Sequence, residues 1–291
     1  MSLDKNSESY IGYLSSKSSN DETTLTKYLK EFEDLNKTTD SIHDLGDFEV
    51  LIILKDGTNL TDWNDVKSKM DIIYVSENLS ECSDLSSKYS GLMSLKAVVV
   101  TEFPAYSMNA ESMFHNCKSL VDISCLKDWD VSGIVTMKAM FHGCKSLKDI
   151  SALKGWDVSK VNNMQSMFNS CWSIEDLNAL TGWDVSNVIS MNHMFFGCRS
   201  LASLSALDKW NVSNVENMEW MFSGCHSLVN LDGLNNWMVS SSLKFDYIFM
   251  GCESLVDASS IDDWDVVFST GWHAFSYCNS LEKTPDWRVS Y

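Results

Sequence analysis

Apolar positions recur along the last two thirds of the chain with a spacing of 27 residues. The pair Met-Phe shows this clearly, since it stands at 140–141, 167–168, 194–195 and 221–222. A cysteine follows each pair, and a tryptophan falls between one cysteine and the next. Repetition at a fixed period of this size is typical of a solenoid, in which each repeat is one rung that packs on its neighbours. The repeated cysteines are Cys117, Cys144, Cys171, Cys198, Cys225, Cys252 and Cys278.

A single rung indicates which elements the pattern predicts. The apolar positions of the segment WDVSKVNNMQSMFNSC are Val161, Met164, Met167, Phe168 and Cys171. Their spacing suits one face of an α-helix, and Ser159 precedes them as the expected N-cap. After the cysteine, apolar residues at every third position predict a short strand followed by a corner. Each rung is therefore expected to contain a short helix, a short strand and a Trp-Asp-Val-Ser connector.

The repeated motif is specific enough to indicate a family. The pattern W-D-V-S-x-V-x-x-M-x-x-M-F-x-x-C-x-S-L-x-x-L-x-x-L resembles the BspA-type leucine-rich repeats, a class of bacterial and protist surface proteins. The resemblance covers residues from about 103 to 291. It implies an α/β solenoid, a leucine-rich-repeat-like stack of about seven rungs of 27 residues. It also implies protein binding or adhesion at a cell surface, with no cofactor and no catalytic activity.

The residues before the repeats have a different character. Residues 1–20 are rich in Ser, Lys, Asn and Asp, and we predict a disordered tail there. Residues 24–36 have apolar side chains at helical spacing, which predicts an amphipathic helix. Residues 48–54 and 71–75 are short apolar runs and predict buried strands.

The two ends of the repeat array are expected to differ. Apolar residues between Leu92 and Val100 resemble a degenerate strand segment one rung ahead of the first full repeat. We therefore expect residues 21–102 to form an N-terminal α/β cap and residues 103–291 to form the repeats. The last connector, DWRVSY, ends at Tyr291 without a polar capping helix. Either the natural chain continues further, or the last rung packs against another molecule.

Charge and composition restrict the partners. The formal net charge of −18 argues against nucleic acid and anionic lipid, whereas a basic protein suits it. No apolar run is long enough to insert into a membrane, and the first ten residues lack the features of a signal peptide. The resemblance implies a cell-surface or secreted protein. The nine cysteines, an odd number, leave a cytoplasmic protein as the alternative.

Cysteine beside histidine in MFHGCKSL, residues 140–147, is the first candidate for chemistry. Parallel stacking points neighbouring Cβ atoms in the same direction, so we expect a buried ladder of free thiols and no disulfides. His115 and His142 have no recurring acidic partner, and we expect no metal site there. The chain lacks G-x-S-x-G, P-loop, G-x-G-x-x-G and paired C-x-x-C motifs, so we do not expect an enzyme.

The connector residues are expected to be structural. Its tryptophans should stack in the core, although a carbohydrate platform is an alternative role for them. Five of the six connector tryptophans are followed by a polar residue, which should hydrogen-bond the turn backbone. These polar residues are Asp130, Asp157, Asp184, Asn211 and Asp265.

Candidate binding residues lie four and five places after each cysteine. In the predicted strand they should project from the exposed face of the sheet, where neighbouring carboxylates would form an acidic stripe. A ligand-binding face and a plain solvated face both fit this pattern. The expected function is a non-catalytic module that binds a protein or matrix ligand through this strand face, with a basic protein as one candidate. The alternative is an intracellular scaffold that binds an endogenous partner. The candidate residues are Asp122, Lys148, Asp149, Glu175, Asp176, Ser203, Asn230 and Asp257.

Overall fold

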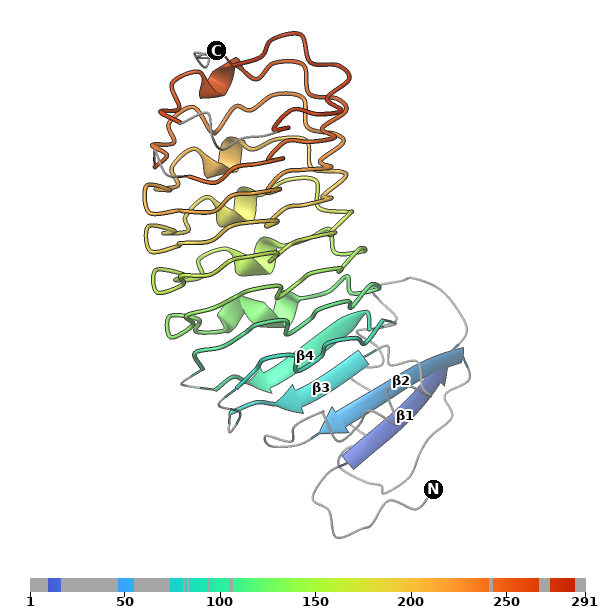
Figure 1. The fold of residues 1–291 in the computed structure, drawn as a ribbon. Helices are drawn as coiled ribbons and strands as arrows, with labels where there is room; N and C mark the ends of the chain where they lie inside the picture. The colour runs from blue at the N-terminus through green and yellow to red at the C-terminus, as the bar shows by residue number, and fades with distance from the viewer. Residues whose placement is uncertain are drawn as a thin grey trace.

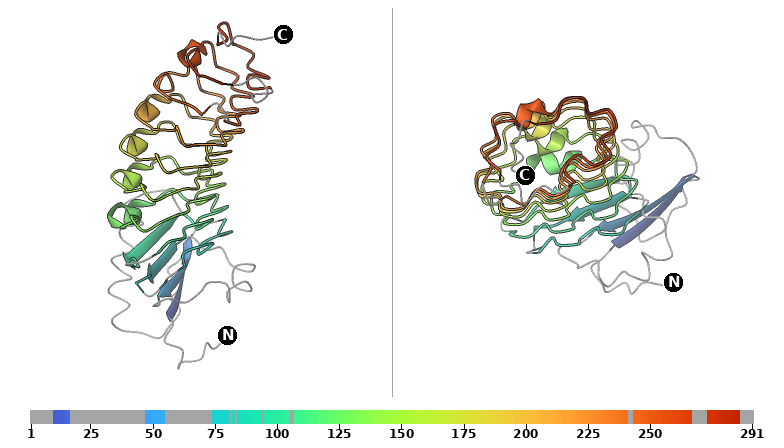
Figure 2. Two further views of the ribbon diagram at one scale, coloured as in Figure 1. Left: turned by 60° about the vertical axis from the view of Figure 1, so that its left-hand side comes forward. Right: turned by 45° about the horizontal axis from the view of Figure 1, so that its top comes forward.

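The protein forms a stack of rungs that rises from a group of N-terminal strands to the C-terminal end (Figure 1). Two further views show that the stack bends and that the rungs have nearly the same outline when seen towards its end (Figure 2). The 27-residue period of the sequence is therefore the period of the fold. The computed structural model describes residues 10–16, 47–54, 74–80, 82, 84–93, 95–104, 107–240, 243–266 and 273–285.

Four strands form the N-terminal end of the stack. Strand β1 (Tyr10–Ser16) pairs antiparallel with β2 (Asp47–Leu54). Strand β3 (Tyr74–Asn78) pairs in parallel with β4 (Ala97–Glu102). Because β2 also lies beside β3, the four strands follow one another in space in their chain order (Figure 1).

Two of these strands correspond to strands expected before the repeats. Strand β2 confirms the strand predicted at 48–54, and β3 overlaps the one predicted at 71–75 but begins at Tyr74. Strand β1 corrects the prediction of a disordered tail for residues 10–16. Its sequence YIGYLSS contains Tyr, Ile and Leu, which favour strands, and the polar residues around it hid this signal. The helix predicted at 24–36 lies outside the described residues.

A degenerate rung precedes the first full repeat, as predicted. The backbone N–H of Leu85 donates to the carbonyl oxygen of Asn109, and that of Tyr89 donates to Met113. The Tyr89 ring stacks on Phe114 with 5.2 Å between ring centroids, so it takes the place that phenylalanine has in later rungs. The stack therefore begins one rung before the full motif does.

The segment predicted to be an α-helix is a series of turns. In one rung, the backbone N–H groups of Ser166, Phe168 and Ser170 donate to carbonyl oxygens of the next rung. The alternate N–H groups close turns onto the carbonyl three residues back. Ser166 and Ser170 have left-handed φ angles of 57° and 60°, whereas an α-helix has negative φ and only internal bonds.

Among the residues that the structure describes, no helix is long and apolar enough to cross a membrane.

The strand predicted after each cysteine is also different in the structure. Within the described ranges, bridges at this position join only Ala97 with Asp122, Asn230 with Asp257, and Asp257 with Lys283. A second set of parallel bridges lies before the turns and joins Asn109, Thr136, Asn163, Ser190, Asn217 and Lys244. Most rungs have a short 3₁₀ helix after the predicted strand position. These helices are η2 (Ser124–Asp128), η3 (Ser151–Leu153), η4 (Asn178–Leu180), η5 (Ser205–Leu207) and η6 (Ser259–Ile261).

Stacked phenylalanine rings run through the core. From Phe114 to Phe275, consecutive rings lie 5.4 to 5.7 Å apart between centroids and are nearly parallel. Most of them are fully buried. Because one rung supplies only one ring to this column, the core closes only when rungs stack.

Candidate binding surface

The repeated cysteines form a buried ladder, as predicted. All are free, and those from Cys117 to Cys252 are fully buried. Each thiol donates to a carbonyl of the preceding rung; for example, Cys198 Sγ lies 3.2 Å from the Phe168 oxygen. Burial raises the pKa of Cys198 to about 12. Since the thiolate is the nucleophile and the metal ligand, these cysteines are unsuited to either role.

The histidines beside the first cysteines are half-buried and close together. The His115 and His142 rings lie 4.8 Å apart between centroids. Burial lowers the pKa of both imidazoles, and the nearby His115 and His193 lower that of His142 further. Over the described part of the chain, no group of three or more His, Cys, Asp or Glu residues is arranged to hold a metal ion.

The candidates five places after each cysteine serve as hydrogen-bond acceptors at turns. Asp149 Oδ1 accepts the backbone N–H of Ser151 at 2.8 Å, where η3 begins. This bond lowers the pKa of the Asp149 carboxyl. Other candidates accept the backbone N–H of the residue two positions later in the same way. They are Asp122, Asp176, Ser203, Asn230 and Asp257. These side chains therefore stabilise the turns, whether or not they also contact a ligand.

The candidates four places after the cysteine form an ion pair across rungs. Lys148 Nζ lies 2.7 Å from Glu175 Oε1, with exposed side-chain fractions of 64% and 57%. A second ion pair across rungs joins two residues that stand five places after their cysteines: Lys283 Nζ lies 2.6 Å from Asp257 Oδ2. Lys283 and Ser259 hold the pKa of the Asp257 carboxyl well below its usual range. The structure thus aligns the predicted candidates along one side of the stack but neutralises part of their charge.

The connector residues are structural where the structure describes their bonds. Asp157 Oδ1 accepts the N–H of Ser159, which replaces the predicted N-cap role of that serine. Asp130, Asp184 and Asn211 accept equivalent bonds, as predicted. Five connector tryptophans donate the indole N–H to a leucine carbonyl of the preceding rung: Trp156, Trp183, Trp210, Trp237 and Trp264.

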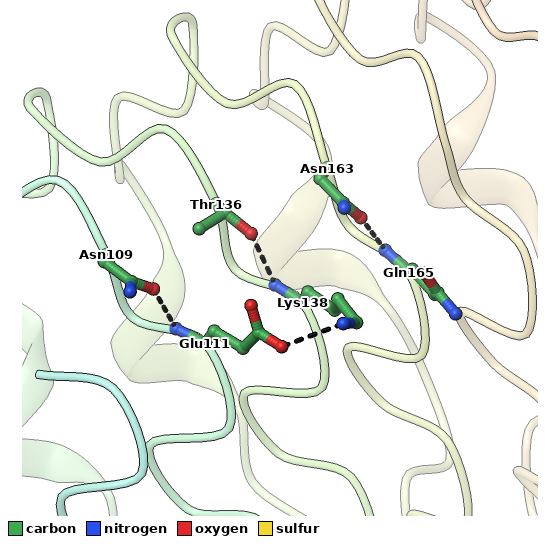
Figure 3. A network of polar contacts seen from close by, with 6 residues as sticks. All are labelled: Asn109, Glu111, Thr136, Lys138, Asn163 and Gln165. Carbon is green, nitrogen blue, oxygen red and sulfur yellow. Dashed lines mark hydrogen bonds and ion pairs between the residues drawn. The ribbon is translucent and has the colours of Figure 1, made fainter.

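A similar set of turn bonds lies at the second row of bridges. Figure 3 shows side-chain oxygens that accept a backbone N–H two residues further on in three successive rungs. Lys138 Nζ also pairs with Glu111 Oε1 at 2.9 Å across neighbouring rungs (Figure 3). The acceptors are Asn109, Thr136 and Asn163, and the donors belong to Glu111, Lys138 and Gln165.

Sequence reasoning missed a row of aromatic side chains on the turns. We define the aromatic row as His193, Trp220, Tyr247 and His273, which stand five residues before the cysteine in successive rungs. Neighbouring ring centroids lie 5.9, 4.2 and 5.3 Å apart, with interplanar angles of 12° to 17°. Phe196 packs edge-on against Trp220 at 6.1 Å. Aligning the repeats would have found this row, because earlier rungs have only Ser112, Ala139 and Ser166 at the position.

Comparisons with solved structures find two proteins that are similar to this chain. A leucine-rich cell surface protein from Faecalibacterium prausnitzii A2-165 has 16% identity and a TM-score of 0.32, covering 81% of this chain and 84% of that chain. A leucine-rich repeat protein from Bacteroides ovatus ATCC 8483 has 12% identity and a TM-score of 0.30, covering 80% and 77%.

No curated protein matches the sequence. A family model described as a Mycoplasma protein of unknown function, DUF285, matches residues 107–203 and 172–287. Together these two segments span the full motifs and more than half of the chain. The chain therefore belongs to the DUF285 family.

Proposed function

We propose that this protein is a non-catalytic binding module that recognises a protein ligand through the outer surface of its rungs. The aromatic row is the observation that carries the proposal. Trp220 and Tyr247 are only half-buried although they are large aromatic residues, and His273 is exposed. Tryptophan and tyrosine are enriched among the residues that contribute most to protein–protein binding. An aromatic surface of this kind is typical of an interaction site.

The backbone does not require aromatic residues at this position. The φ angle is left-handed there in every rung, at 58° for His193 and 61° for Trp220, but also at 58° for Ser112 and 53° for Ala139. The earlier rungs thus adopt the same conformation with small side chains. The change from small to aromatic residues therefore supports a role at the surface rather than a need of the turn.

The strand-face candidates are a second contact surface within the same proposal. Asp149 and Asp176 each use one carboxylate oxygen in a turn and are exposed to solvent. A basic ligand could therefore still pair with them. We also propose a cell-surface location, which the resemblance of the 27-residue motif to BspA-type repeats supports. An intracellular scaffold remains the alternative.

The proposal is tested with the double variant Trp220→Ser, Tyr247→Ser. Serine already occupies this position at 112 and 166, so the fold should tolerate it. Wild-type protein, the double variant and a Met238→Ser control, at a side chain 75% exposed elsewhere on the surface, are immobilised and incubated with cell-surface and cytosolic extracts.

We expect a protein that the wild type and the Met238 control retain and that the double variant loses. The extract that supplies it identifies the location. Equal retention by all three proteins would exclude the aromatic row as the contact surface. Failure to retain any protein from either extract would contradict the proposed function.

A further inference from the structure

Basic side chains occupy one position in four of five successive rungs of a chain whose net charge is −18, and a tryptophan occupies it in the middle rung. The position directly follows the repeated cysteine, and the next residue in the series is Glu253, where the basic run ends. Backbone bonds keep this position in register between rungs, since the Ser227 N–H donates to the Arg199 carbonyl at 3.1 Å and the Ser146 N–H donates to the Lys118 carbonyl at 3.1 Å. We define the basic column as Lys118, Lys145, Trp172, Arg199 and His226.

Trp172 holds two of these cations in place. Lys145 Nζ lies 3.7 Å from the centroid of the Trp172 ring, and Arg199 Cζ lies 4.3 Å from it. Because the two cations come from the rungs on either side, the indole lies between them. Cation–π attraction restrains both long side chains and leaves their charges unneutralised.

Among the residues that the structure describes, no acidic side chain forms an ion pair with a basic member of the column. Within the described ranges, ion pairs are made by Lys138, Lys148 and Lys283, all at other positions of the rungs. In a protein with 40 acidic and 22 basic residues, unpaired cations in a row are unexpected on the basis of charge alone. They form a positive strip on a surface that is otherwise strongly acidic.

Small and hydroxylated residues flank the basic column on both sides. The residue after each column member is a serine, and Ser173 Oγ donates to the Lys145 carbonyl at 2.8 Å. On the other side, two residues earlier, Gly143, Gly197 and Gly224 leave the backbone without side chains. A Cβ on Gly224 would lie 4.0 Å from His226 Nε2, so the column side chain lies over the glycine.

We propose that the basic column binds an acidic polysaccharide that lies along the stack. Cations at one position of several rungs suit the repeating acid groups of a linear polymer, and the serine hydroxyls suit its hydroxyl groups. An apolar or extended peptide would call for an apolar pocket or a free strand edge, whereas serine and glycine flank this column; an acidic peptide is the competing ligand that the experiment below distinguishes. The acidic remainder of the surface repels a polyanion and confines it to the column. This site is separate from the aromatic row and goes beyond the proposed protein binding.

The experiment measures binding of the full chain to polygalacturonate at low ionic strength by isothermal titration calorimetry. The test variant is Lys145→Ala, Arg199→Ala. The control variant, Lys148→Ala, Lys154→Ala, removes the same number of positive charges from side chains of one rung that lie outside the column. Melting curves of all proteins confirm that they are folded.

We expect the test variant to bind roughly tenfold more weakly than wild type, which corresponds to about 1.4 kcal/mol. The control variant should bind nearly as well as wild type, and added salt should weaken wild-type binding. Neutral dextran should not bind. Trp172→Ala should also weaken binding, because the two cations lose their common support.

Three results would overturn the proposal. The first is that wild-type protein fails to bind polygalacturonate at low salt. Second, both double variants could lose affinity equally, which would indicate general electrostatics. Third, polyglutamate could bind as tightly as polygalacturonate, which would indicate an acidic peptide or a site for any polyanion. The Trp220→Ser, Tyr247→Ser variant should keep wild-type affinity for polygalacturonate, so failure here is distinguishable from failure of the proposed protein binding.

Discussion

Two neighbouring tryptophans allow a sharp prediction about the energetics of the stack. Trp129 and Trp156 are 3% and 5% exposed, so both indoles are buried. The Trp156 Nε1–H donates to the Leu126 carbonyl at 3.0 Å, whereas Trp129 Nε1 has no hydrogen-bond partner in the part of the chain that the structure describes. Trp129 is the first of the series and packs against Phe103, with 5.0 Å between ring centroids. Replacement by phenylalanine should therefore affect the two positions differently.

The magnitudes follow from what each replacement removes. Both lose about 1–2 kcal/mol because phenylalanine fills less of the core. Trp156→Phe also loses a hydrogen bond with a net contribution of about 1 kcal/mol. The Leu126 carbonyl stays satisfied because it also accepts the Trp129 backbone N–H at 3.2 Å. Trp129→Phe instead removes the buried indole N–H that has no partner among the described residues. The folded state then no longer carries the cost of burying that donor, which is about 1–3 kcal/mol.

We therefore expect Trp156→Phe to lower the free energy of unfolding by about 2–3 kcal/mol and Trp129→Phe to change it by between a loss of about 1 kcal/mol and a gain of about 2 kcal/mol. Equilibrium urea unfolding followed by far-UV circular dichroism measures both, with midpoint and slope compared across variants. Trp183→Phe, whose indole N–H donates to the Leu153 carbonyl at 3.2 Å, should match Trp156→Phe. Equal destabilisation by all three replacements would refute this reasoning.

Further predictions concern the turns, the surface ion pair and pH. Asp149→Ala should lower the free energy of unfolding by about 1 kcal/mol in urea titrations, because the Ser151 N–H loses its acceptor; no change would contradict the structural role. Lys148→Ala should change it by about 0.5 kcal/mol or less, because its pair with Glu175 is exposed; a larger loss would show that the pair matters. Burial lowers the folded-state pKa of His142, so stability is full above the unfolded pKa of about 6.5 and falls as the pH drops below it. His142→Asn, which introduces the residue that the next rung has at this position, should reduce that fall, and an unchanged pH profile would contradict it.

The period and the core could be predicted from sequence because stacking requires identical side chains to meet. Phe141 contacts Phe114 and Phe168, so a change of residue at one rung would disturb two interfaces. The cysteine ladder follows from the same requirement, since the free thiols are small and buried. These features depend on the repeat alone, which the sequence displays directly.

The local conformation could not be predicted in the same way. Apolar residues three apart, such as Met164 and Met167, fit turns closed onto the carbonyl three residues back as well as they fit a helix. In an α-helix every backbone N–H donates within the helix. In these turns, alternate N–H groups donate to carbonyl oxygens of another rung. That information is absent from any single repeat.

The candidate surface was predicted in part. The pattern Asp149-x-Ser151 is a turn signal, and it was interpreted as a strand face because the apolar residues around it seemed to continue the sheet. The aromatic row and the basic column escaped notice because each differs from rung to rung. Only comparison of equivalent positions, such as Ser166 with Trp220, makes them visible.

Thiol labelling tests most directly whether the repeated cysteines build the scaffold and leave binding to the surface. A chromogenic disulfide reagent is added to native protein and to protein unfolded in urea, and mass spectrometry locates the modified residues. We predict that all nine cysteines react when unfolded. In the native protein, we expect the partly exposed Cys82 to react first. Cys125 and Cys278 should react more slowly, because burial raises the pKa of both thiols, and the fully buried repeated cysteines from Cys117 to Cys252 should stay unmodified. Rapid modification of these buried thiols in the native protein would contradict the account.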